Sequence, residues 1–308
     1  MNRFIRLRLL AMILGLPFLL IFISGCGSSS QKKDEPPVYS PLQVLVPEAT
    51  GKETLGSSPM ILDVSNISQG YFIAQSDSSD LTCSLQIISP SGVLYSYFIA
   101  PGESATVTFT EGSGDYTITG YQQVQGDQYA ALYSETVTVQ LENDFLPFLY
   151  PNQYVNFTPD SKASQLALSL IDEDTVDVDA LQQIYDYVVS NLTYDYEKAD
   201  TVTTGYLPDV DETLKTGTGI CFDYAALTTA MLRSCDIPCK LQIGYAGDIK
   251  HAWIDVYIRS KGWVNQAVSF KGDTWTLMDP TFDSNSDDKE AIQDYIGDES
   301  NYTVQFTR

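Results

Sequence analysis

The sequence predicts a multidomain chain in which an all-β sandwich is followed by an α+β domain. Three features support this prediction: an apolar segment behind arginines at the start, alternating apolar and polar residues next, and apolar residues at helical spacing further on. A period of two is typical of strands, and a period of about 3.6 is typical of helices. We therefore assign residues 1–25 to a signal peptide, 26–40 to a tether, 41–144 to the β-sandwich and 145–308 to the α+β domain.

The N-terminal segment has the layout of an export signal. Arg3, Arg6 and Arg8 precede an uncharged apolar run over Leu9–Ile23, which is too short for an ordinary membrane-spanning helix. The run leads into the letters ISGC, which end at Cys26 and resemble the lipobox of bacterial lipoproteins. The resemblance implies cleavage before Cys26 and a lipid on its sulfur, which would anchor the exported protein to the outer face of the bacterial cytoplasmic membrane. A plain secretory signal and an uncleaved anchor are the alternatives.

The composition excludes some classes of partner. The 308 residues carry a formal net charge of −23, and such a surface repels phosphate backbones, so we expect no nucleic acid partner. The carboxylates are scattered and form no EF-hand loop, and one histidine cannot complete a histidine-rich metal site. We therefore expect neither a metal nor another cofactor.

The cysteines give no zinc-binding pattern. Besides Cys26 the chain has Cys83, Cys221, Cys235 and Cys239, whose spacing matches no known zinc motif. Cys235 and Cys239 could form a disulfide, or they could be two small, half-buried thiols, which is the simpler expectation.

Strand patterns fill the region between residues 41 and 140. Short alternating runs bounded by turn residues lie at Leu81–Ile87, Val93–Ile99, Ala105–Phe109, Tyr116–Tyr121 and Tyr129–Val139. Their regular spacing indicates an antiparallel β-sandwich. No catalytic cluster falls in this region, so we expect it to be a spacer or a binding module.

Helical spacing appears after a linker that prolines interrupt at 145–159. We expect helices over Ser161–Leu170 and Val178–Leu192, followed by a polar loop over Tyr194–Gly219. Another helix should begin near Cys221 and end by Pro238.

Cys221 stands where a reactive thiolate is favoured. Gly217 and Gly219 come directly before it, and good helix formers follow, so it should lie at a helix N-terminus. Free N–H groups and the helix dipole stabilise a thiolate there, and the same groups can bind the oxyanion that forms when a carbonyl is attacked.

A base and an orienting group follow Cys221 in the chain. His251 opens the strand-like run HAWIDVYI, in which alternate residues should face opposite sides. Asp279 ends another strand-like run, directly before Pro280. A cysteine nucleophile needs a base, and the base needs a third group to orient it, so Cys221, His251 and Asp279 are the candidate catalytic residues.

These motifs resemble those of a known family. GxCxxYAxLxxAML, HAW and MDPTFD are similar to the core of the transglutaminase-like enzymes, a papain-related fold with a cysteine nucleophile. The resemblance covers roughly residues 145–283 and implies that Cys221 attacks an acyl donor, His251 is the base and Asp279 orients it. Papain-like enzymes also have an oxyanion side chain, for which Tyr206 and Gln183 are candidates. Between HAW and MDPTFD this chain has an extra segment, KGWVNQAVSFKGDTW, which we expect to form a hairpin.

Two functions remain in competition. The first is acyl transfer or hydrolysis at a peptide or glutaminyl amide of a protein or peptide substrate through a Cys221 thioester, with hydrolysis expected over crosslinking because water is always present. The second is a non-catalytic surface lipoprotein that binds a ligand and has an inactive transglutaminase-like scaffold.

Overall fold

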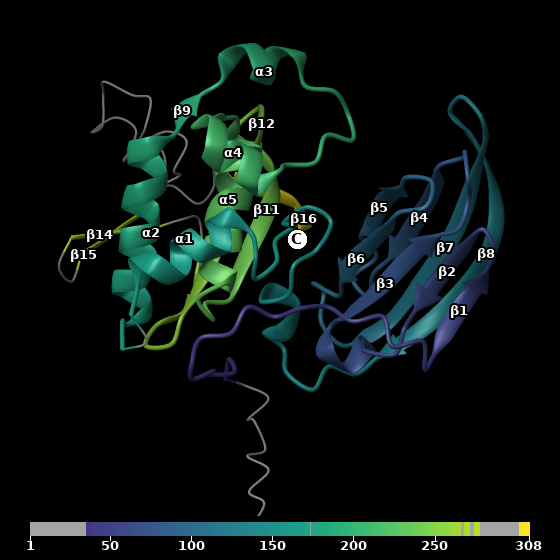
Figure 1. Cartoon of the computed structure of the whole chain (residues 1–308), viewed down its shortest axis with the longest axis horizontal. Helices are drawn as coiled ribbons and strands as arrows, with labels where there is room; N and C mark the ends of the chain where they lie inside the picture. Colours follow the sequence, from purple (N-terminus) through teal and green to yellow (C-terminus); the bar gives the residue numbers. More distant parts are fainter. Residues whose placement is uncertain (1–34, 173, 266–267, 272–273, 278–301) are drawn as a thin grey trace, which may run out of the picture. The chain divides into compact units, whose positions relative to one another are not determined.

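Figure 1 shows a computed structural model of the chain, which describes residues 35–172, 174–265, 268–271, 274–277 and 302–308. These residues all lie in one compact unit, Gln31–Arg308. In the described part of the chain, no helix has both the length and the apolar character needed to cross a membrane. The predicted signal peptide, Cys26 and Asp279 lie outside the described residues.

Eight strands form two antiparallel sheets, which we call the N-terminal sheets (Figure 1). Their orders are β1-β2-β3-β6 and β5-β4-β7-β8. Alternation gives β4 one apolar side: Cys83, Leu85 and Ile87 are buried, whereas Ile88 at its end is exposed. Buried side chains from both sheets belong to one hydrophobic core, so the sheets share their apolar faces. The strands are β1 Thr54–Ser57, β2 Met60–Asp63, β3 Tyr71–Ser76, β4 Cys83–Ile88, β5 Leu94–Ile99, β6 Ser104–Thr108, β7 Gly114–Gln125 and β8 Gln128–Val139.

The C-terminal part contains a third sheet, and helix α5 packs against its strands β11 and β12. The order of the sheet is β13-β12-β11-β16, with all neighbours antiparallel, and its strands are β11 Cys239–Ala246, β12 Ile249–Ile258, β13 Gly262–Val264 and β16 Tyr302–Thr307. The predicted extra segment forms a hairpin of β14 Val268–Lys271 and β15 Thr274–Leu277. The helices are α1 Lys162–Leu170, α2 Asp177–Asn191, α3 Tyr196–Thr201, α4 Val210–Thr216 and α5 Cys221–Arg233, and two 3-10 turns lie at Ile67–Gln69 and Leu146–Phe148.

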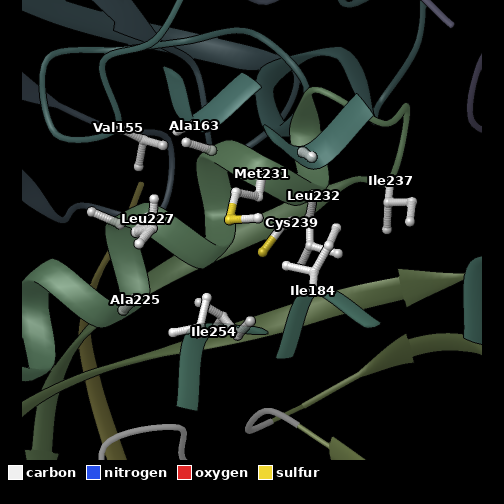
Figure 2. Close-up of a cluster of buried hydrophobic side chains, with 14 of the residues drawn as sticks. Val155, Ala163, Ile184, Ala225, Leu227, Met231, Leu232, Ile237, Cys239 and Ile254 are labelled. Carbon is white, nitrogen blue, oxygen red and sulfur yellow. The ribbon is translucent and has the colours of Figure 1, made fainter. Parts of the chain in front are cut away.

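Helix α5 lies at the centre of the C-terminal core, which we call the helical core. Every residue of α5 from Asp223 to Arg233 is buried, because the helix is apolar on nearly all sides and is covered by α1, α2, α4, β11 and β12. Figure 2 shows its Leu227, Met231 and Leu232 among side chains of the neighbouring elements. Each such side chain contributes roughly 1.5–3 kcal/mol when fully buried, and truncating one to alanine would cost about 2–5 kcal/mol.

The region predicted to be a linker is buried. Phe145 packs edge-on against Tyr257 with ring centroids 4.5 Å apart, and Leu146 and Leu149 belong to a hydrophobic cluster of their own. The prolines do interrupt regular structure, but the apolar side chains between them still bury their surface. The backbone carbonyl of Tyr150 accepts a hydrogen bond from the buried Arg233, at 2.8 Å.

The start of the folded part also differs from the predicted division. Residues 35–40, assigned to the tether, contact the C-terminal part: the N–H of Tyr39 donates to Asp236, and the carbonyl of Pro37 accepts from Arg259. Leu42 and Val44 pack in the helical core, although the sequence assigned them to the sandwich. Apolar residues in this proline-rich stretch have no period, so their pattern does not indicate which core they join.

The predicted polar loop between residues 194 and 219 contains two short helices and a strand pair. Asp195 caps α3 by accepting from the N–H of Lys198, and Asp209 caps α4 by accepting from two N–H groups of its first turn. Aspartate is a preferred N-cap residue. The strands β9 Thr193–Tyr194 and β10 Thr218–Gly219 then pair in parallel and bring the chain to α5.

Candidate active site

Cys221 is the first residue of α5 and is half-buried, as the sequence predicts for its helix position. Gly217 ends α4 with a left-handed φ of 63°, which glycine adopts without strain. Gly219 passes so close to Asp223 that an added Cβ would lie 2.6 Å from the Cβ of that residue. The two glycines therefore let the chain turn tightly into the N-terminus of α5.

His251 lies on β12 opposite Gly244 of β11, and only 7% of its surface is exposed. Its ring is nearly parallel to the buried Trp253, with centroids 6.3 Å apart. The alternation predicted for β12 is confirmed on one side, where Ala252 and Ile254 enter the helical core. The other side is buried as well, so His251 is held in a fixed place rather than on a solvated face.

One cavity of about 460 Å³ is lined by both Cys221 and His251. The structure thus brings together two of the three candidate catalytic residues, and Asp279 lies outside the described residues. The cavity is lined by the N-terminal end of α5 with β11 and β12, by the segment 194–207, and by outer side chains of β5, including Leu94 and Phe98. Residues 153–154 and the C-terminal Phe306 and Arg308 line it as well.

The two candidate oxyanion side chains differ in position. Gln183 is exposed on α2 and does not line the cavity, whereas Tyr206 does. The Tyr206 hydroxyl donates to the carboxylate of Asp223 and accepts from Lys198 Nζ at 2.6 Å. Its proton is therefore already engaged by Asp223.

Asp223, Lys198 and Tyr206 form a network that the sequence did not reveal, and we call it the clamp. The buried Asp223 carboxylate accepts from Lys198 Nζ at 2.7 Å and from the N–H of Ile220 at 2.8 Å. Burial, and then the bond to Asp223, raise the pKa of Tyr206 to about 12. Burial alone would lower the pKa of Lys198, but its bonds to Asp223 and Tyr206 together raise it. At neutral pH the clamp therefore holds a protonated lysine and a neutral phenol, and it ties the 196–207 segment to the helix that carries Cys221.

The other described cysteines have no comparable setting. Cys83, Cys235 and Cys239 are buried and free, so Cys235 and Cys239 do not form a disulfide. Burial raises the pKa of both Cys235 and Cys239 to about 12, which keeps them as inert thiols. Among the described residues, no group of three or more His, Cys, Asp or Glu side chains is placed to hold a metal ion.

Residues 164–280 match the sequence pattern of the Transglutaminase-like superfamily, and the match includes Cys221, His251 and Asp279. The matched stretch, 117 of the 308 residues, is similar to a transglutaminase-like domain. The matched range begins within α1 and ends directly after Asp279, so the N-terminal sheets lie outside it. A search of the curated proteins finds no match.

Solved structures that resemble the chain are distant in sequence. A provisionally assigned cysteine protease from Cytophaga hutchinsonii is 16% identical with a TM-score of 0.37, and the alignment covers 83% of this chain and 84% of that one. The periplasmic domain of TgpA from Pseudomonas aeruginosa is 14% identical with a TM-score of 0.31, covering 69% of this chain and 91% of that one. A red sea bream transglutaminase is 15% identical with a TM-score of 0.26, covering 70% of this chain and 48% of that one.

Proposed function

We propose that the protein is a cysteine-nucleophile enzyme that cleaves peptide or glutaminyl amide bonds through a thioester on Cys221. The observation that carries the proposal is the shared cavity: a cysteine at the first position of a buried helix and a buried histidine line the same space. A helix N-terminus favours the thiolate, and an imidazole beside it can hold and deliver the proton.

The reaction follows from these two groups. The Cys221 thiolate attacks the amide carbonyl carbon, a C–S bond forms, and first-turn N–H groups of α5 stabilise the oxyanion. The proton on His251 passes to the nitrogen as the C–N bond breaks and the amine leaves. Water then gives a proton to His251 while its oxygen attacks the thioester carbon, which breaks the C–S bond, releases the acid and restores the thiolate.

Asp279 completes the proposed triad by analogy with the family motif. It follows the β14–β15 hairpin in the chain and falls inside the matched range. Its carboxylate would orient the His251 ring and stabilise the imidazolium without touching the substrate.

We further propose that the enzyme works outside the cell, held at the membrane by lipid on Cys26. The arginine-flanked apolar run and the ISGC ending support this placement. Water can reach any acyl-enzyme there, which favours hydrolysis over crosslinking. The N-terminal sheets would form a sandwich domain that supplies the β5 wall of the cavity.

Thiol alkylation tests the proposed nucleophile. With iodoacetamide at neutral pH, Cys221 should react faster than a free cysteine model compound and faster than Cys83, Cys235 and Cys239, as read by peptide mapping. His251→Ala should remove this advantage, and Ile249→Ala, at an exposed position on the same strand, should keep it. A Cys221 rate that equals the model compound and is unchanged in His251→Ala would favour the non-catalytic binding protein instead.

A further inference from the structure

The cavity has a charge opposite to that of the chain. The chain carries 40 acidic and 17 basic residues. Yet none of the described residues that line the cavity is an aspartate or a glutamate, whereas Lys250 and Arg308 both line it. A positive, mostly apolar pocket in an acidic protein attracts an anionic group locally, although the outer surface repels it.

Arg308 is held in a cage of aromatic rings. Its Cζ lies 4.1 Å from the ring centroid of Tyr154, and 4.6, 4.8 and 5.4 Å from those of Tyr95, Tyr97 and Phe306. Tyr154 and Phe306 also line the cavity. Only 4% of Arg308 is exposed, so its long side chain has a fixed place.

The guanidinium has hydrogen-bonding capacity that the described residues do not use. Nη1 donates to the Tyr97 hydroxyl at 2.7 Å, but Nε is buried without a partner, and no ion pair joins Arg308 to a described carboxylate. A buried cation is costly unless it is paired, and ring faces offset only part of that cost. A guanidinium presents parallel N–H groups that match a carboxylate in two bonds.

From the charge of the cavity and the unused donors we infer that Arg308 is a binding site for a carboxylate of the peptide substrate. The inference rests on the proposed function, because it names a feature of the substrate that Cys221 would attack. Lys250, exposed at the same cavity, adds positive charge but no fixed geometry.

The distance between the two sites sets the length of the substrate. The Tyr154 ring, which contacts Arg308, lies 6.3 Å from the ring of Phe222, the neighbour of Cys221. Neighbouring rings therefore connect the residue that holds the guanidinium in place with the residue next to the nucleophile. The preferred spacing between the carboxylate and the amide that reacts is the quantity that probes of graded length measure.

Paired alkylating probes test the carboxylate site. N-iodoacetyl-ω-amino acids of increasing length, and the same compounds with the carboxylate converted to a carboxamide, react at Cys221 and differ only in charge at one end. The ratio of the two rates on the full chain, with the labelled cysteine identified by peptide mapping, measures recognition of the carboxylate. In the wild type this ratio should reach at least about tenfold at one preferred length, since charged hydrogen bonds are the strong ones.

Three variants make the test specific to Arg308. Arg308→Gln should bring the ratio close to one, and Arg308→Lys should retain part of it. Lys240→Gln is the matched control, because Lys240 is a half-buried cation over aromatic rings, with Nζ 3.9 Å from the Trp263 centroid, but does not line the cavity. Since both rates come from the same variant, a loss of folded protein cancels from the ratio.

The outcomes separate this inference from the proposed function. A ratio near one at every length in the wild type, or a high ratio that Arg308→Gln leaves intact, overturns the carboxylate site. A high ratio that falls in Arg308→Gln, with slow absolute rates for both probes, supports the site while contradicting an activated thiolate. Probes built on Gly-Asp-amide and on Gly-Asn with a free C-terminus then distinguish an acidic side chain from a chain end as the source of the carboxylate.

Discussion

Asp236 has a buried carboxyl group, and among the described atoms only one of its two oxygens accepts a hydrogen bond. Oδ2 accepts from the N–H of Tyr39, whereas Oδ1 is buried without a partner among the described atoms. Burial raises its pKa to about 7, against the opposing effects of the Tyr39 bond and the charge of Arg259. Its backbone has a left-handed φ of 58°, which asparagine also tolerates.

Replacing Asp236 by asparagine should flatten part of the pH dependence of stability. Between about pH 4 and 7 the folded carboxyl keeps a proton that the unfolded one has lost, so the free energy of unfolding falls as pH rises through this window. Asp236→Asn should therefore be more stable than the wild type at pH 8, by about 1–2 kcal/mol, and similar at pH 4. Urea unfolding at both values measures this, with the exposed Asp248→Asn as control. An equal difference at both pH values would contradict it.

The three candidate catalytic residues should not contribute equally. Cys221→Ala and His251→Ala should abolish turnover of a mixed peptide library followed by mass spectrometry. Asp279→Ala should leave a remnant, roughly 10⁴-fold below the wild type, because an orienting group makes no bond to the substrate. The losses should not add in double variants. Complete loss in Asp279→Ala with its fold intact would mean that this residue does more than orient His251.

Elements with strong periodicity were predictable, and those that depend on tertiary contacts were not. Helices α1 and α2 and the strands β4 to β8 follow their apolar patterns to within a few residues. Strand β16 was not predicted, although its letters YTVQFT alternate apolar and polar residues, and in the fold it pairs with β11. The motif letters marked Cys221 and His251 as members of one site, and both line the same cavity, while their catalytic roles stay a prediction. The clamp was not predictable, because Lys198 and Asp223 are 25 residues apart and meet only in the fold.

The clamp should control how firmly the 196–207 segment covers the cavity. Tyr206→Phe removes one hydroxyl that bonds both Asp223 and Lys198, which should weaken the attachment by about 1–3 kcal/mol. Hydrogen exchange and limited proteolysis over residues 199–207 should become faster, while α5 stays protected. Tyr196→Phe, at a tyrosine that is 66% exposed on α3, is the control. If hydrogen exchange over residues 199–207 is as slow in Tyr206→Phe as in the wild type, the clamp does not hold this segment at the cavity.

Buried hydrogen bonds join the N-terminal sheets to the C-terminal part. Arg308 Nη1 donates to the Tyr97 hydroxyl of β5, and Asn152 Nδ2 donates to the Thr108 hydroxyl of β6. Within the C-terminal part Arg233, the last residue of α5, donates to the carbonyls of Tyr150, Cys239 and Arg308. Burial lowers the pKa of its guanidinium to about 10, so it remains charged at neutral pH. The buried 145–159 segment and these bonds explain why a division at residue 145, suggested by the change of period, does not mark a loose hinge.

Membrane attachment is the prediction that concerns the chain as a whole. If lipid on Cys26 is the anchor, a fatty-acid analogue should label the wild type, and Cys26→Ser should abolish the label and release the protein from membranes. Cys83→Ser, at a buried position, is the control and should keep both. Undiminished labelling of Cys26→Ser would rule out that cysteine as the lipid site.

The pairing of β11 has a consequence for how the chain folds. One edge of β11 pairs with β12, which follows it after a short turn. The other edge pairs with β16, which comes late in the chain: Thr307 lies 65 residues after its partner Gln242. Until that late pairing forms, β11 presents an open row of backbone donors and acceptors, which is where chains join wrongly and aggregate. Nascent or refolding chains should therefore pass through a vulnerable interval that ends only when Tyr302–Thr307 docks, and helper proteins that shield open strand edges would raise the yield most during that interval.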